Sequence, residues 1–277
     1  IGHESTPSGQ DAAKALIEIY LNWIPKEKIL TTNVWSSELA KLASNAMLAQ
    51  RISSINSLSA LCEKTGAKIT ELSKAIGMDR RIGPDFLKAS VGFGGSCFKK
   101  DILNLVYLCQ YYGLDEVAEY WNQVIVINNY QINRFSKKII NELDGNISNK
   151  TIAILGWAFK KNTNDSRESA SIYVSVNLLI QGASLNIYDP MVNKKRILDD
   201  IEFLLKNKGF AKKDLALMLN KINVLKSYKD AIEKSVLVAI LTEWDEFKDY
   251  KWDQLTKTRK LFDGRNLISS ADYSIGI

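Results

Sequence analysis

The sequence predicts an α/β fold in which an all-helical part precedes a doubly wound parallel sheet. Between Ser36 and Leu143 the apolar residues recur at steps of three or four, which is the spacing of one buried helix face. After Asp144-Gly145-Asn146 the pattern changes to short apolar runs that alternate with helical segments. That alternation is typical of parallel strands joined by crossover helices.

Residues 1–34 are the first of three expected parts. We expect an amphipathic helix over 8–24 and a short strand over 28–33. These elements suit the tail end of a domain whose earlier part is absent, and the chain does not begin with methionine. We therefore expect these 277 residues to be a fragment or a processed product.

Residues 35–145 are expected to form the central helical part. Ser36 or Ser37 can cap its first helix. Within that helix Lys41 and Asn45 are four positions apart and share one face, although a lone pair of this kind is usually solvated. The long last helix indicates a spine that supports oligomerisation. Helices are expected over residues 36–66, 68–77, 98–112 and 115–143.

Residues 146–277 are expected to carry the sheet. Its strands are apolar runs bounded by turn residues, with helical segments between them. Strands are expected over residues 151–156, 185–190, 223–225, 236–242 and 260–265, and helices over residues 169–179, 193–207, 211–220 and 228–234.

Ligands of such sheets bind at the carboxyl ends of the strands. The residues at those ends are 156–161, 188–190, 242–245 and 263–265. After the first strand, Phe159-Lys160-Lys161 offers one aromatic face and two cations. That combination suits a nucleotide phosphate.

Length and composition limit the classes of function. A chain of 277 residues is long enough for about two domains of ~100–200 residues each. The net charge is +6 with both signs well mixed, so an anionic small substrate is expected and a nucleic-acid partner is not. We also expect no membrane partner, since no apolar run approaches ~20 residues and no secretory signal is recognisable.

The cysteines and the histidine restrict the chemistry. An odd count of three cysteines without framework spacing favours a reducing compartment, which we take as the cytoplasm. Cys62 and Cys109 fall on apolar helix faces and are expected to be structural. His3 is the only histidine, so histidine-assisted catalysis and a metal site are not expected. Acid–base chemistry then falls to Lys, Asp, Glu, Cys or water.

The most informative stretch is Gly92-Phe93-Gly94-Gly95-Ser96-Cys97-Phe98-Lys99-Lys100-Asp101. Its glycines let the backbone lie close against a ligand, and Cys97 follows them at the start of a predicted helix. The positive end of a helix, with Lys99 and Lys100 nearby, favours a thiolate and hence a nucleophile. The alternative is a phosphate-binding turn or a small buried cysteine. The dinucleotide fingerprint G-x-G-x-x-G is excluded, because Cys97 stands where its last glycine is required.

Further distinctive runs extend along nearly the whole chain. They are Trp35-Ser36-Ser37-Glu38-Leu39, Ala49-Gln50-Arg51-Ile52-Ser53-Ser54-Ile55-Asn56, Phe86-Leu87-Lys88-Ala89-Ser90, Asp165-Ser166-Arg167-Glu168-Ser169, Tyr188-Asp189-Pro190, Thr242-Glu243-Trp244 and Phe262-Asp263-Gly264-Arg265. Together with the block around Cys97, they resemble the UDP-glucose 6-dehydrogenases of the eukaryotic type. Sister enzymes that act on GDP-mannose or UDP-N-acetyl sugars share parts of this set.

The resemblance implies an architecture and a cofactor. Members of the family begin with a Rossmann domain that holds NAD. By this resemblance residues 1–34 are the tail of that domain, 35–145 the central dimerisation and catalytic domain, and 146–277 a Rossmann-like UDP-sugar-binding domain. The family oxidises UDP-glucose twice to UDP-glucuronate, with two NAD⁺ and one water. Its members are often hexamers built from dimers, which implies a homo-oligomer here.

The resemblance also implies catalytic roles. Cys97 is the nucleophile, which adds to the aldehyde and gives a thiohemiacetal whose oxidation leaves a thioester. Asp101 and Lys41 handle the water and the proton transfers and stabilise the oxyanion, and Asn45 positions both. Cys97 and Arg167 contact NAD.

Substrate-binding residues follow from the same resemblance, and among them Arg81 reaches the substrate of a neighbouring subunit. The residues implied are Lys41, Leu42, Ala43, Ser44, Asn45, Arg81, Phe86, Leu87, Lys88, Ala89, Ser90, Val91, Gly92, Phe93, Gly94, Phe98, Phe159, Lys160 and Arg265.

Two alternatives stay open. The chain is either part of a sister enzyme for UDP-N-acetyl sugars or GDP-mannose, or a UDP-sugar-binding and dimerisation module without turnover. We expect the isolated chain to be inactive, because hydride transfer needs the cofactor held on the reacting carbon.

Overall fold

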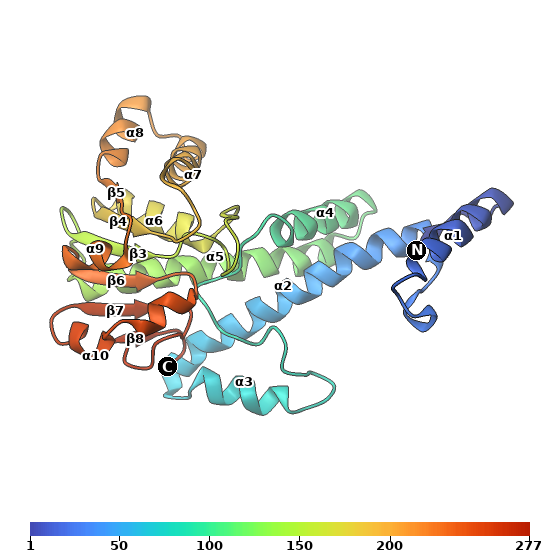
Figure 1. The fold of residues 1–277 in the computed structure, drawn as a ribbon, viewed down its shortest axis with the longest axis horizontal. Helices are drawn as coiled ribbons and strands as arrows, with labels where there is room; N and C mark the ends of the chain where they lie inside the picture. Colours follow the sequence, from blue (N-terminus) through green and yellow to red (C-terminus); the bar gives the residue numbers. More distant parts are fainter.

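The computed structural model describes residues 1–277. Figure 1 shows a sheet with its helices at one end, long helices leading away from it, and a small N-terminal part at the other end. The helical part precedes a parallel sheet in the chain, so the predicted fold class is confirmed.

The N-terminal part contains a two-stranded parallel pair, β1 (Gly2–His3) with β2 (Thr32–Asn33), and the helix α1 (Pro7–Tyr20). α1 ends earlier than predicted, because the Asn22 side-chain amide donates to two carbonyl groups of its last turn. The strand predicted over 28–33 was too long. A 3₁₀ helix over Lys26–Lys28 overlaps the start of the predicted strand, and only Thr32 and Asn33 pair with β1.

Four helices form the central part, as predicted. They are α2 (Val34–Thr65), α3 (Ile69–Gly77), α4 (Phe98–Tyr111) and α5 (Asp115–Glu142). The predicted cap was wrong, because Asn33 Oδ1 accepts from the backbone N–H of Ser36 at 2.8 Å and α2 begins before either predicted serine. α2, α4 and α5 pack together in pairs. None of the helices is long and apolar enough to cross a bilayer.

The second half forms a six-stranded parallel sheet in the order β5-β4-β3-β6-β7-β8. Its strands are β3 (Thr151–Leu155), β4 (Ser184–Tyr188), β5 (Ile222–Val224), β6 (Leu237–Ile240), β7 (Lys260–Asp263) and β8 (Tyr273–Ser274). Its helices are α6 (Ala170–Ile180), α7 (Lys194–Asn207), α8 (Lys212–Leu219), α9 (Tyr228–Glu233) and α10 (Trp252–Leu255), with a 3₁₀ helix at Asp245–Asp249. β8, α10 and the 3₁₀ helix were not predicted, since such short elements show no period.

The strand order creates a crevice between β3 and β6. From β3 the chain adds β4 and β5 on one side and then returns to place β6 on the other. Ligands of doubly wound sheets bind at such a switch point. Gly156, directly after β3, has φ +94°, and a Cβ there would lie 2.4 Å from Thr242 Cβ. Glycine therefore lets the chain leave β3 close against the end of β6.

Glu63, near the end of α2, links the helical part to the sheet through hydrogen bonds and ion pairs. Its Oε1 accepts from Tyr273 Oη at 2.8 Å and from the Gly276 backbone N–H at 3.1 Å. From α5, Lys138 and Arg134 approach its carboxylate to 2.8 and 3.3 Å. Burial opposes ionisation of Glu63, but these partners outweigh burial and lower its pKa. The C-terminus consequently lies against the end of α2, as Figure 1 shows.

Candidate functional site

A cavity of about 860 Å³ is lined by segments from both halves of the chain. Its wall includes α3, the segment that leads to α4, and the loops that follow β3, β6 and β7. Eleven of the residues that the resemblance implied for substrate line it, namely Phe86, Lys88, Ala89, Ser90, Gly92, Phe93, Gly94, Phe98, Phe159, Lys160 and Arg265. The crevice between β3 and β6 is therefore part of a larger cavity.

The charge of the cavity wall is positive. Five cationic side chains line it, those of Lys88, Lys160, Lys161, Lys248 and Arg265. They outnumber the two carboxylates, those of Asp85 and Glu243. Four phenylalanines complete the wall with aromatic surface. A wall of this kind suits an anionic ligand that also has a flat or apolar part.

Three buried amide side chains fix the backbone of the segment before α4. The Ser90 N–H donates to Asn56 Oδ1 at 2.8 Å, and Gln131 Nε2 donates to the Ser90 carbonyl at 2.7 Å. Asn128 holds Phe93 in the same way, accepting from its N–H at 2.9 Å and donating to its carbonyl at 3.1 Å. Since all three amides are buried in α2 and α5, their hydrogen bonds fix the path of this segment against the two helices.

Leu87 and Val91 belong to the same segment but do not line the cavity. Both side chains are buried in the core that surrounds the sheet. The Val91 N–H donates to the carbonyl of Gly264 at 2.7 Å, directly before Arg265. Their contribution is therefore to dock the segment on the end of β7.

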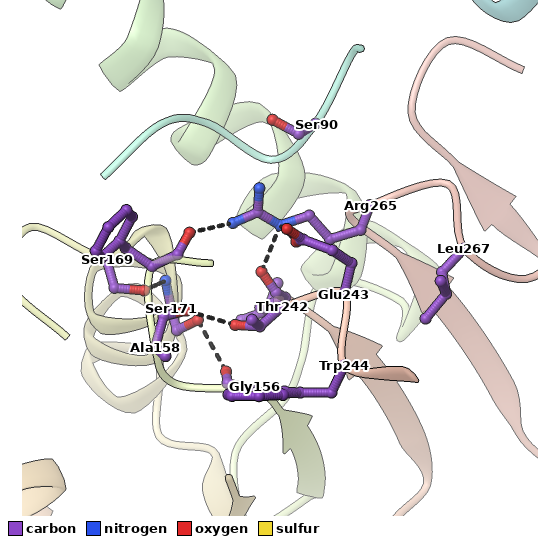
Figure 2. A network of polar contacts seen from close by, with 12 residues as sticks. Ser90, Gly156, Ala158, Ser169, Ser171, Thr242, Glu243, Trp244, Arg265 and Leu267 are labelled. Carbon is purple, nitrogen blue, oxygen red and sulfur yellow. Dashed lines mark hydrogen bonds and ion pairs between the residues drawn. The ribbon is translucent and has the colours of Figure 1, made fainter. Parts of the chain in front are cut away.

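Arg265 is held at the carboxyl edge of the sheet by two backbone carbonyl groups. Its Nε donates to Leu241 O at 2.7 Å and its Nη2 to Phe159 O at 3.1 Å. Figure 2 shows the guanidinium group spanning the ends of two strands. Asp263 accepts from the backbone N–H groups of the turn that carries Arg265, and burial raises the pKa of this carboxyl.

The glycine-rich loop packs against the segment that carries Arg167. The Gly95 N–H donates to Arg167 O at 2.8 Å, and a Cβ on Gly94 would lie 2.5 Å from Glu168 O. Only glycine permits this approach at position 94. The loop ends at Cys97, which is exposed and stands at the N-cap of α4. Cys62 and Cys109 are buried, in agreement with the structural role expected for them.

The charges around Cys97 differ in part from the prediction. Lys99 Nζ donates to Glu168 Oε2 at 2.8 Å and to Tyr173 Oη at 3.1 Å, and Lys100 Nζ lies 4.0 Å from Asp101 Oδ1. Both predicted cations are therefore paired with carboxylates. Arg167 pairs with Asp165 at 2.8 Å, and this pair raises the pKa of the guanidinium.

Lys41 and Asn45 share one face of α2, as predicted, and that face meets α4. Both donate to Oδ2 of Asp101, Asn45 at 2.5 Å. The Asp101 side chain is only 3% exposed, whereas that of Lys41 is 57% exposed. Burial opposes ionisation of Asp101, but the two donors outweigh it and lower the pKa. Asp101, Lys41 and Asn45 thus form a cluster of a carboxylate, an ammonium group and an amide, and Asp101 lies one helical turn after Cys97.

Other residues implied by the resemblance lie outside the cavity. Leu42, Ala43 and Ser44 do not line it, and Ser44 Oγ donates to the Ala40 carbonyl within α2. Arg81 is exposed and pairs with Asp79 at 2.6 Å. Arg167 lines a separate opening of about 530 Å³ with Asn164, Asp165, Ser166, Met191, Val192, Asn193 and Arg196. No group of three or more His, Cys, Asp or Glu side chains is placed to hold a metal ion.

The sequence missed several residues of the cavity wall. From α2, α3 and the turn after α3 these are Ile52, Ile69, Thr70, Ser73, Pro84 and Asp85, and from the loops after β6 and β7 they include Lys248, Asn266 and Leu267. Ile52 falls in one of the distinctive runs, but nothing in the sequence assigns the first group to the wall, because only the packing of α3 beside α2 brings it to the sheet edge. The rule on strand ends had pointed to Lys161 and Glu243.

Two models of one family match this chain. Residues 35–130 match the central domain of the UDP-glucose/GDP-mannose dehydrogenase family, and residues 153–270 match the UDP binding domain of the same family. This chain belongs to that family. The resemblance inferred from the motifs is thereby confirmed.

Individual relatives agree with the family assignment. The UDP-glucose 6-dehydrogenase of Bos taurus is 53% identical over 272 residues, which cover 97% of this chain and 54% of the relative. That of Drosophila melanogaster is 52% identical over 97% of this chain and 56% of the relative. A UDP-glucose dehydrogenase structure from the archaeon Pyrobaculum islandicum superposes with TM-score 0.78 at 27% identity, over 95% of this chain and 55% of that chain. This family member therefore spans about half the length of the curated relatives it matches.

Proposed function

We propose that this chain is the substrate-binding and catalytic-cysteine part of an NAD-dependent UDP-glucose 6-dehydrogenase. The reaction is the twofold oxidation of UDP-glucose to UDP-glucuronate. The observation that carries the proposal is the positively charged cavity between the glycine-rich segment and the strand ends, with Cys97 directly beside it in the chain. The names of the relatives and their match over 97% of the chain support this choice of nucleotide sugar.

The nucleotide diphosphate is assigned to the cations at the sheet edge. Two N–H groups of Arg265 are already used by backbone carbonyls, so the guanidinium is fixed before a ligand arrives. Its remaining N–H groups can bind phosphate oxygens in the bidentate geometry that guanidinium favours. Lys160, in the loop after β3, adds a second positive charge to the same wall. Preorganisation of this kind lowers the entropic cost of binding.

The chemistry is assigned to Cys97 and the cluster around Asp101. The first oxidation removes a hydride from C6 of glucose and a proton from its hydroxyl group, and water accepts that proton. The thiolate of Cys97 then adds to the resulting aldehyde carbon and forms a C–S bond, and Lys41 stabilises the oxyanion by donating to it. Loss of a second hydride leaves a thioester on Cys97. Water then adds to the thioester carbon, the C–S bond breaks, and the thiolate is released with the carboxylate product.

Asp101 is suited to the hydrolytic step because it remains ionised. Its lowered pKa keeps a carboxylate at neutral pH, and Lys41 and Asn45 both occupy Oδ2. Oδ1 is left to accept a proton from the attacking water. Asn45 fixes the carboxylate in the orientation that this requires.

The residues beside Cys97 fit a phosphate of NAD. Arg167 is largely exposed, uses Nε and Nη2 for Asp165, and has no protein partner for Nη1. NAD⁺, when bound, would accept one hydride per molecule, so the two oxidations would use two NAD⁺ in succession. Arg167 would hold the diphosphate near the thiol.

A homo-oligomer in the cytoplasm is part of the proposal. Apolar and aromatic side chains are exposed along α2, α4 and α5, among them Met47, Leu61, Tyr107, Tyr111 and Tyr120. A second copy of the chain can cover this surface. Arg81 is exposed and could then reach the substrate of the neighbouring subunit.

The proposal is tested by following NADH absorbance with NAD⁺ and UDP-glucose. For a longer form that also carries an NAD-binding domain, we expect two NADH for each UDP-glucose consumed. For the 277-residue chain alone we expect none, since it contains no dinucleotide fingerprint. GDP-mannose and UDP-N-acetyl sugars should give no turnover. One NADH for each substrate would contradict the twofold oxidation, and turnover by the chain alone would contradict the need for another cofactor-binding part.

A further inference from the structure

We propose that Glu243 determines specificity within the cavity by accepting a hydrogen bond from a hydroxyl group of the bound sugar nucleotide. The inference rests on the proposed function, since it assigns a role to a second group in the same cavity. Its basis is the position of one carboxylate oxygen among the cations of the wall.

Glu243 follows β6 and its carboxylate lies beside Arg265, as Figure 2 shows. Its Oε2 is 3.3 Å from Arg265 Nε, which is close enough for an ion pair. The contact is not a hydrogen bond, because the single N–H of Nε is directed to Leu241 O at 2.7 Å. Oε2 is consequently buried without any hydrogen-bond partner.

A buried carboxylate oxygen without a hydrogen-bond donor raises the free energy of the folded chain. We therefore infer that the bound ligand supplies the donor. Phosphate groups cannot supply that partner, because at neutral pH they carry negative charge and few protons. A hydroxyl group of the ribose or of the glucose can donate to Oε2. Glu243 and Arg265 therefore divide the recognition between them, with Arg265 binding phosphate and Glu243 binding a neutral donor.

A purely positioning role for Glu243 fits the contacts less well. Arg265 is already oriented by Leu241 O and Phe159 O, at 2.7 and 3.1 Å. Its side chain is only 13% exposed, so its conformation is also restricted by packing. Glu243 is not needed to hold the guanidinium in place.

The test is calorimetric titration of the wild-type chain, Glu243→Ala and Glu243→Gln with UDP, 2′-deoxy-UDP, 3′-deoxy-UDP and UDP-glucose. We expect Glu243→Ala to weaken binding of the ligand with the recognised hydroxyl by about 10- to 100-fold, the range for a hydrogen bond to a charged group. The analogue that lacks that hydroxyl should bind both proteins equally. Glu243→Gln should lose less, because its amide oxygen can still accept.

The four ligands identify the hydroxyl. A loss seen with UDP but not with one deoxy analogue places it on the ribose, and a loss confined to UDP-glucose places it on the glucose. Glu233→Ala, which removes an exposed carboxylate on α9, is the matched control and should bind every ligand as the wild type does.

Two results would overturn the inference. An equal loss for all four ligands would show that Glu243 acts only through Arg265, and unchanged binding of all four would show that it has no role. If the wild-type chain bound none of these nucleotides, the proposed function itself would fail. That outcome is distinguishable from a failure confined to Glu243.

Discussion

In a form that also carries an NAD-binding domain, replacing Cys97 by serine is expected to lower turnover by roughly 10³-fold or more, because a serine hydroxyl without a neighbouring base is a weak nucleophile. Serine keeps the size of the side chain, so the start of α4 should be preserved. Cys97 does not line the cavity, so UDP-glucose should bind the variant as tightly as the wild type. The measurements are kcat from NADH formation and the Kd of UDP-glucose.

Cys109→Ser is the matched control for this prediction. Cys109 lies on the same helix but is buried, so its replacement should alter stability and leave kcat unchanged. Exposure of Cys97 also predicts that iodoacetamide alkylates one thiol of the native 277-residue chain quickly, and that Cys97→Ser removes the fast phase. If Cys97→Ser instead lost UDP-glucose binding, and kcat fell only for that reason, Cys97 would have a structural role and not a catalytic one.

Replacing Glu63 by alanine is expected to destabilise the fold by about 3–5 kcal/mol, the range for removing one partner of a buried ion pair. Arg134, only 11% exposed, would keep its charge and lose its carboxylate. Tyr273 and the Gly276 N–H would also lose their acceptor, so β8 should detach from the end of α2. Urea unfolding measures the loss, and amide hydrogen exchange at β8 locates it.

The pH dependence of Glu63 gives a second measure. Because its pKa is lowered in the folded chain, its contribution is fully present above its ordinary value of 4.5. The contribution is lost as the pH falls through the lowered folded value. When the pH falls from above 4.5 to below the folded pKa of Glu63, the wild type should therefore lose more stability than Glu63→Gln. A Glu63→Ala protein within about 0.5 kcal/mol of the wild type, as for an ordinary surface substitution, would contradict this role.

The sequence predicted the large elements because their apolar spacing repeats often enough to be recognised. The helices α2 and α5 repeat their apolar spacing over many turns, and the five longer strands follow one another as apolar runs. β8 has only two residues and therefore no period. At the start of α2, the cap was misassigned because asparagine and serine can serve equally well, and only the path from β2 decides between them.

The site was predictable where its residues are consecutive. The glycine-rich loop and Phe159-Lys160 combine several signals in one short run, and both meet in the cavity. Nothing in the sequence predicted the contacts of the Asn56, Asn128 and Gln131 amides with the segment before α4, because a polar residue on a predicted helix is expected to face water. Lys99 was predicted to act on Cys97, but Glu168 reaches it from a loop that is distant in the sequence. Such contacts depend on tertiary packing.

The most direct test of the central claim is calorimetric titration of the 277-residue chain with UDP, UDP-glucose and NAD⁺ in turn. The positively charged cavity predicts that UDP and UDP-glucose bind. The lack of a dinucleotide fingerprint predicts that NAD⁺ does not bind measurably to the chain alone. If neither UDP nor UDP-glucose bound, that result would contradict the assignment of this cavity to the substrate.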